Sequence, residues 1–295
     1  MEHIVVGVDG SPHAADALRW AVRESKLRAA ELTAVLVWDY LGQHHPDGST
    51  GFHTDFDAAA ATRSIDSYVA AALGPEAAGL VHAQAVFGLP AGGLLEASES
   101  AALLVLGARG RGGFRELLLG SVSQRCLHEA PCPVAIIRSG PTDAAAGFGR
   151  VVVGVDGSSH GSAALDWAAR EASLRHAHLR VVHACATNVA GVPFLPSQVS
   201  LPEVANKEAL ALLEHAVSNA QTPDGLVIEL VAASGSPAKA LLDASHDADL
   251  VVVGRAGRSL WTGLVLGSVA TQISHHSRIP AVFVSSTDGP VPSGG

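Results

Sequence analysis

Several residue types and patterns are scarce or missing in this chain of 295 residues, and each absence excludes a class of protein. The three cysteines, Cys126, Cys132 and Cys185, lack the C-x-x-C spacing of zinc and redox sites. They indicate small buried side chains in a reducing compartment. No apolar run is long enough to cross a membrane, and no leader pattern is recognisable. We therefore expect no stable membrane insertion and a cytoplasmic location.

Positive charge is also scarce. The chain has 19 Lys and Arg against 28 Asp and Glu, which gives a formal net charge of -9 at pH 7. Affinity for the phosphate backbone of a nucleic acid requires a basic surface. We therefore expect no nucleic-acid binding, and any polyanion bound here must be held by a local site.

Common phosphate-binding motifs are missing as well. No G-x-G-x-x-G follows the first predicted strand, and no G-x4-G-K-[ST] occurs, which excludes a standard dinucleotide site and a Walker P-loop. A receiver-type phosphorylation site would need an acidic cluster, but Asp9 alone ends that strand.

What the chain does contain is a repeat with an offset of 147 residues. The sequence VVGVDGS occurs from Val5 to Ser11 and again from Val152 to Ser158. The pattern Gly-x2-Gly-x9-Gly-Ser begins at Gly107 and again at Gly254. Glycines at a fixed spacing indicate backbone positions that tolerate no side chain, so a unit of about 147 residues is duplicated in tandem.

Each repeat alternates short apolar strands with helical patterns. In the first repeat we expect strands at 4–8, 32–38, 80–86, 103–106 and 134–137. We expect helices at 14–28 and 121–129, an Ala-rich helix that ends near 73, and a short helix that begins at 90. This order predicts two tandem Rossmann-like, doubly wound α/β domains, each with a five-stranded parallel sheet of order 3-2-1-4-5. We place the domains at 1–140 and 149–286, with a linker at 141–148 and a flexible tail at 287–295.

The glycine motif falls where an open α/β sheet binds ligands, at the carboxyl ends of the strands. Gly107 ends the fourth strand, and Gly120 and Ser121 stand where the next helix begins. A helix N-terminus presents unpaired N–H groups and partial positive charge, so this arrangement predicts a phosphate cradle facing Asp9. The alternative is that the glycines serve tight turns and Asp9 caps a helix.

With these motifs the chain resembles the universal stress protein family, and specifically its tandem-domain, ATP-binding members. The resemblance covers nearly the whole chain. It implies that the aspartates contact ribose or metal, that Val37 and Ala184 meet adenine through their backbone, and that the glycines and serines line the ribose and phosphates. The implied site residues are Asp9, Gly10, Val37, Gly107, Arg109, Gly110, Gly120, Ser121, Val122 and Ser123 in the first repeat, and Asp156, Gly157, Ala184, Gly254, Gly257, Gly267, Ser268 and Val269 in the second.

The resemblance also implies a function. We expect an ATP-binding regulator of stress or growth adaptation that acts on an unidentified protein partner. Magnesium binding near Asp9 and Asp156 is an open alternative. Homodimerisation, or pairing of the two repeats through their last strands, is a further implication. The alternatives are a slow ATP-hydrolysing enzyme and a nucleotide-free interaction module.

Three further features of the chain concern these sites. Ala270 stands where Ser123 does, so we expect the second site to be the weaker one, while Arg255 partly offsets the loss of Arg109. The histidines 44, 45, 53, 275 and 276 lack the partners of a metal site, and we expect them at the surface. Trp38 and Trp261 should lie near the nucleotide.

Overall fold

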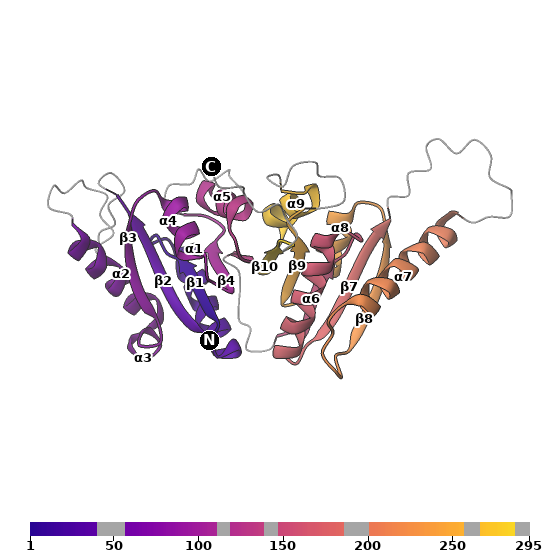
Figure 1. Ribbon diagram of the computed structural model, residues 1–295, viewed down its shortest axis with the longest axis horizontal. Coiled ribbons are helices and arrows are strands. Elements are labelled where there is room, and N and C mark those ends of the chain that lie inside the picture. Colours follow the sequence, from indigo (N-terminus) through magenta and orange to yellow (C-terminus); the bar gives the residue numbers. More distant parts are fainter. Residues whose placement is uncertain (40–56, 111–118, 139–146, 186–200, 257–265, 287–295) are drawn as a thin grey trace. The chain divides into compact units, whose positions relative to one another are not determined.

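The computed structural model describes residues 1–39, 57–110, 119–138, 147–185, 201–256 and 266–286. The chain divides into two compact units, Met1–Thr142 and Asp143–Gly295. Figure 1 shows both units.

Both units alternate strands and helices. The first contains β1 (His3–Gly7), α1 (Pro12–Arg28), β2 (Glu31–Trp38), α2 (Ala58–Leu73), α3 (Pro75–Ala78), β3 (His82–Phe87), α4 (Pro90–Ala97), β4 (Leu103–Gly107), α5 (Ser121–Glu129) and β5 (Val134–Ile137). The second contains β6 (Arg150–Gly154), α6 (Ser159–Leu174), β7 (His178–Cys185), α7 (Leu201–Asn219), β8 (Ile228–Ser234), α8 (Pro237–Ala244), β9 (Leu250–Gly254), α9 (Ser268–His276) and β10 (Ala281–Val284).

The strand order within each unit is the one expected from the sequence. The first unit has the order β3-β2-β1-β4-β5 and the second β8-β7-β6-β9-β10, and the paired strands are parallel. This confirms two Rossmann-like domains in tandem. In such an order β1 and β4, like β6 and β9, lie side by side where the winding direction reverses, and a crevice forms at their carboxyl ends.

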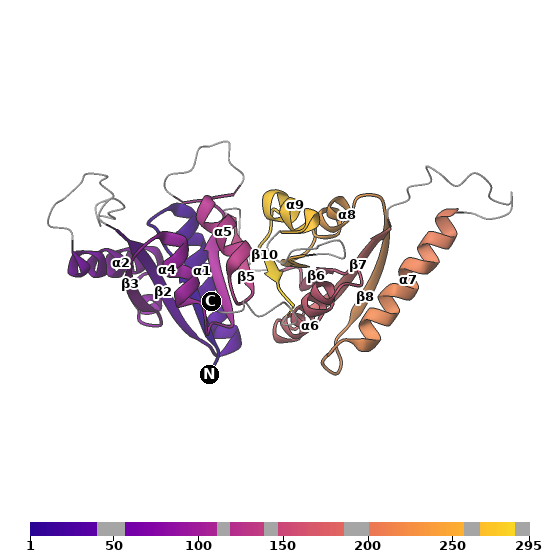
Figure 2. The same cartoon turned by 45° about the horizontal axis from the view of Figure 1, so that its top comes forward.

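Helices cover both faces of each sheet. In the first unit α1 and α2 pack on one face and α4 and α5 on the other, and α6 and α7 are opposite α8 and α9 in the second (Figures 1 and 2). The central strands are therefore buried on both sides, as Ile4, Val5 and Val6 show with 0% exposure. Burial on both faces explains why these strands are continuous apolar runs rather than alternating ones.

Helix α1 begins at Pro12, and the Ser11 hydroxyl caps it by accepting the Ala14 N–H at 3.1 Å. Two other elements differ from expectation, each for a local reason. A short helix, α3, was not expected. Its carbonyls accept the N–H groups of residues 80 and 81, so β3 starts only at His82. Among the described residues, no helix is long and apolar enough to cross a membrane.

Candidate functional site

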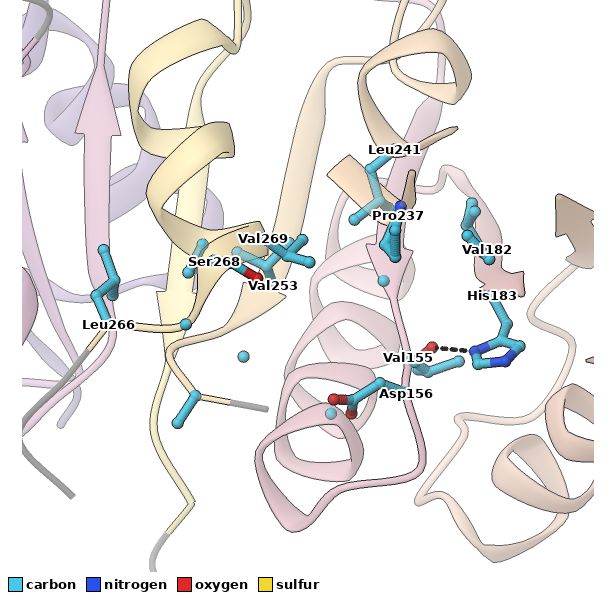
Figure 3. A pocket seen from close by; sticks show the side chains of 17 residues that line it. Val155, Asp156, Val182, His183, Pro237, Leu241, Val253, Leu266, Ser268 and Val269 are labelled. Atoms are coloured by element: carbon cyan, nitrogen blue, oxygen red, sulfur yellow. Dashed lines mark hydrogen bonds between the residues drawn. The ribbon is translucent and has the colours of Figure 1, made fainter. Parts of the chain in front are cut away.

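A cavity of about 520 Å³ lies at the carboxyl edge of the second sheet. Figure 3 shows it between the ends of the strands and the first turns of α8 and α9, with Pro237 and Leu241 on one side and Ser268 and Val269 on another. The volume falls within the range of about 300 to 1,000 Å³ that is usual for small-molecule sites. The cavity is thus in the place where an open α/β sheet is expected to bind a ligand.

The structure brings most of the predicted residues of the second repeat to this cavity. Those that line it are Asp156, Ala184, Gly254, Gly267, Ser268 and Val269. Gly157 is not among the lining residues, and its φ of +77° shows that it is needed for the turn after Asp156. Gly257 lies outside the described residues.

The first repeat has the same local geometry at Asp9. The Asp9 carboxylate accepts the Ser11 N–H at 3.0 Å, just as Asp156 accepts the N–H of Ser158. Gly10 between them has a φ of +80°. A Cβ added at Gly110 would collide with the Asp9 carboxylate, so the loops after β1 and β4 are in direct contact.

Two of the helices that begin at the carboxyl edge, α5 and α9, are not capped by a side chain. Gly120 is the N-cap of α5 and Gly267 that of α9, and neither helix has a side-chain cap hydrogen bond. The first intrahelical bonds are donated by Gln124 at 2.9 Å and by Thr271 at 2.8 Å. The N–H groups of positions 121–123 and 268–270 therefore precede the helical ladder, which makes each end a place where an anion is stabilised.

Not every glycine of the motif is explained by a ligand. A Cβ at Gly107 would lie 2.8 Å from the backbone carbon of His13, and one at Gly254 would lie 2.8 Å from that of His160. These two glycines let the first turn of α1 or α6 approach the neighbouring strand. At Gly120, by contrast, an added Cβ would meet no atom of the described residues closer than 3.6 Å. The described part of the chain therefore does not require glycine at this position.

The hydroxyl of Ser123 is used within the protein. It donates a hydrogen bond of 2.8 Å to the Gly107 carbonyl, and the side chain is buried. A hydroxyl has one proton to donate, so the contact with a phosphate that the sequence suggested would require this bond to break. The remaining predicted residues of this unit differ in accessibility. Ser121 is exposed, Arg109 and Val122 are partly buried, and Val37 is buried.

Two polar residues near the sites were not identified from the sequence. His183 lines the cavity, and its Nδ1 donates to the Val155 carbonyl at 2.8 Å (Figure 3). Tyr68 donates its hydroxyl proton to the Ser11 carbonyl at 2.8 Å. Burial, together with the nearby negative charge of Asp9, raises the pKa of Tyr68 above its usual range. Comparison of the repeats could have singled out His183, because its counterpart is the apolar Leu36.

Of the tryptophans and histidines singled out in the sequence, three lie within the described residues: Trp38, His275 and His276. Trp38 is buried, and its ring stands 5.1 Å from that of Phe87 in an edge-on arrangement. His275 and His276 end α9 with their rings 6.3 Å apart. The other three histidines and Trp261 lie outside the described residues. Within the described part of the chain, no three His, Cys, Asp or Glu side chains form a group that could hold a metal ion.

Comparison with known proteins shows the same duplication. The model of the universal stress protein family matches residues 1–138 and again 147–285. Universal stress protein Rv2623 of Mycobacterium tuberculosis is 33% identical over 295 residues and covers 95% of each chain. A universal stress protein of Mycolicibacterium smegmatis is 33% identical over 289 residues, or 95% of this chain and 96% of that one. The crystal structure of a universal stress protein from Archaeoglobus fulgidus superimposes with a TM-score of 0.66 at 22% identity, over 96% of this chain and 98% of the other.

Proposed function

The chain belongs to the universal stress protein family, and from this premise we propose that it binds adenine nucleotides, ATP foremost, at the carboxyl edges of its two sheets. In this proposal the bound nucleotide biases the conformation or the choice of a protein partner, so the protein acts as a regulator of stress or growth adaptation.

One observation carries the proposal. The cavity of the second unit has an uncapped helix N-terminus on one side and a carboxylate, Asp156, on another, with an apolar wall between them. N–H groups suit phosphate oxygens, a carboxylate accepts hydrogen bonds from sugar hydroxyls, and an apolar wall suits the base. The first unit has the same aspartate loop and an equally uncapped α5, which supports a second site of the same kind.

The residues also fit a magnesium ion that arrives with the nucleotide. Asp9 and Asp156 would supply carboxylate oxygens, and the ion would neutralise phosphate charge when bound. Magnesium is commonly held by one or two carboxylates together with substrate phosphates. The proposal therefore needs no metal site built by the protein alone.

Slow hydrolysis is the second candidate function, because a carboxylate beside the phosphates could hold the metal that hydrolysis uses. A nucleotide-free interaction module is the third, and it would require the cavity to serve no ligand. The Asp156 carboxylate also has a structural role, because it accepts hydrogen bonds from the N–H and the hydroxyl of Ser158. What favours nucleotide binding over the third function is the apolar cavity together with the uncapped start of α9.

The deciding experiment is to denature the purified protein and identify any released nucleotide, and then to measure melting with millimolar ATP. We expect an adenine nucleotide to be released and the melting temperature to rise. A melting temperature indifferent to ATP, ADP and AMP would remove the proposal.

A turnover assay separates the regulator from the hydrolase, because a pure regulator leaves ATP intact over many hours. Dimerisation stays a prediction, which sedimentation velocity checks.

A further inference from the structure

Two arginines of the first unit lie on neighbouring strand ends beside the proposed phosphate position. The Ala108 N–H donates to the Ile137 carbonyl at 2.8 Å, so the residues that follow each, Arg109 and Arg138, lie next to each other at the carboxyl edge. Burial and the positive charge of Arg109 lower the pKa of Arg138. The positive charges of Arg109 and Arg138 repel each other, and an anion bound beside them would relieve that repulsion.

The same edge carries the start of α5. The Gly120 N–H donates to the Ala108 carbonyl at 2.8 Å, and a Cβ at Gly120 would lie 3.6 Å from the Arg109 Cα. The positive end of the helix dipole and the backbones of Arg109 and Arg138 therefore lie together at this edge of the first sheet. Such a concentration of positive charge is notable in a chain with a net charge of -9.

The second unit lacks both of these cations. At the offset of 147 residues, Ala256 stands for Arg109 and Ser285 for Arg138, although the backbone bond is kept, from the Arg255 N–H to the Val284 carbonyl at 2.8 Å. No Lys or Arg is among the cavity's lining residues that the structure describes, and Asp156 is the one Asp or Glu among them.

Arg255 does not replace the missing pair. It is buried, with an exposed fraction of 7%, and it does not line the described cavity. Its charge acts on His160, whose pKa is lowered by burial, raised by Asp156 and lowered again by Arg255. Arg255 therefore acts on a residue in the first turn of α6, whereas the Arg109 backbone lies at the start of α5.

We propose that the two sites take ligands of different charge: the first holds a nucleoside triphosphate, with Arg109 and Arg138 as specificity-determining cations, and the second holds a nucleoside or nucleoside monophosphate. The proposal rests on nucleotide binding at both edges and adds how the two sites divide the ligands. A triphosphate brings up to four negative charges, which an apolar cavity with one carboxylate and no Lys or Arg among its described lining residues disfavours. A ligand with one phosphate or none can be held there by the N–H groups of α9 and the apolar wall.

The test uses the full chain and resolves the sites by NMR. The amide signals of Gly120 and Gly267, assigned by substitution, report each site during titration with ATP, ADP, AMP and adenosine in magnesium-free buffer. At the Gly120 site we expect affinity to fall at least tenfold from ATP to AMP. At the Gly267 site we expect the two affinities to agree within threefold or AMP to bind more tightly. A tenfold preference for ATP at Gly267, or no preference at Gly120, would overturn the proposal.

Substitutions of Arg138 test its role in the ATP preference of the first site. Arg138→Ser copies the second repeat and should reduce the ATP preference of the first site about tenfold, whereas Arg138→Lys should keep most of it. Arg125→Ser is the matched control, because Arg125 is exposed on α5 and pairs with Glu129. This variant loses the same charge, and we expect the first site to keep its preference for ATP over AMP. Preference retained in Arg138→Ser would show that Arg138 has no part in it.

A reverse variant guards against loss of folding. Ala256→Arg with Ser285→Arg should give the second site a preference for ATP over AMP, a gain that misfolding cannot produce. Failure of this gain in a folded variant counts against the proposal. If no signal responds to any of the four ligands, nucleotide binding itself is wrong, and this outcome differs from equal preference at both sites.

Discussion

Among single residues, the glycines of the repeated motif differ in what they do. Gly107 and Gly254 are required by the packing of α1 and α6, whereas no atom of the described residues lies close enough to Gly120 to require glycine there. The sequence pattern alone could not separate these roles, because both kinds of glycine recur with the same spacing. The contacts around an added Cβ separate them.

This difference gives a stability prediction in the absence of ligand. Gly107→Ala should lower the free energy of unfolding by about 1 to 3 kcal/mol, because the new Cβ meets the His13 backbone at 2.8 Å. Gly120→Ala should cost less, about 0.5 to 1 kcal/mol, because its Cβ enters ordinary van der Waals space and the loss comes only from alanine being a poorer N-cap than glycine. Urea denaturation of both variants provides the measurement. Equal losses would show that Gly120 also has a packing role.

Ser123 supports a second prediction at this scale. Its hydroxyl donates to Gly107 inside the protein, so Ser123→Ala should reduce the free energy of unfolding by about 1 kcal/mol. ATP affinity should change less than threefold. Denaturation and titration calorimetry on one protein sample measure both quantities. A large loss of affinity without loss of stability would restore the phosphate contact expected from the sequence, and with it Ala270 as the reason for a weaker second site.

At the scale of elements, the order and type of the main helices and strands were predictable from the sequence. The parallel order followed from buried apolar runs that alternate with amphipathic segments, and it is the order observed. The short helix α3 was missed because Pro75 and the carbonyls of one turn define it, and no periodicity extends over four residues. The approach of α2 to the first site was also missed, because it depends on tertiary packing.

Tyr68 makes that approach, and a pH dependence follows from it. Its hydroxyl joins α2 to the carbonyl of Ser11, the N-cap of α1. The folded pKa of Tyr68 is raised, so its stabilisation is complete below the ordinary tyrosine pKa of about 10 and is lost as pH rises above that value. We expect stability to fall more steeply above pH 10 in the wild-type protein than in Tyr68→Phe.

The measurement is urea denaturation between about pH 8 and 11 for both proteins. At neutral pH the Tyr68→Phe variant should be less stable by about 1 kcal/mol, the usual value of one hydrogen bond. Tyr40 is the only other tyrosine and ionises in both proteins, so it cancels in the comparison. Parallel curves above pH 10 would mean that the burial of Tyr68 does not persist in solution.

For the whole molecule, the duplication keeps the fold and changes the sites. The same offset that aligns the buried strands also aligns Leu36 with His183, Arg109 with Ala256 and Arg138 with Ser285. Core positions accept any apolar residue of similar size, whereas a site changes its ligand when one charge is lost. Two units that fold alike therefore need not bind alike. The sequence revealed the duplication, but the consequence of each exchange depended on which side chains line the cavity.

The unequal sites lead to a last prediction on the stability of the full chain. A ligand at about 100 times its Kd stabilises a protein by about 2.7 kcal/mol, which for a unit of this size corresponds to a rise in Tm of roughly 5 to 11 °C. If the first site is the one that takes ATP, Gly267→Ala should keep the ATP-induced rise, and Gly120→Ala should lose most of it because its Cβ enters the phosphate position. Differential scanning calorimetry with and without ATP measures the rise, and AMP serves as the ligand control. A full ATP-induced rise in Gly120→Ala, together with its loss in Gly267→Ala, would assign the triphosphate to the second unit and refute the arginine argument.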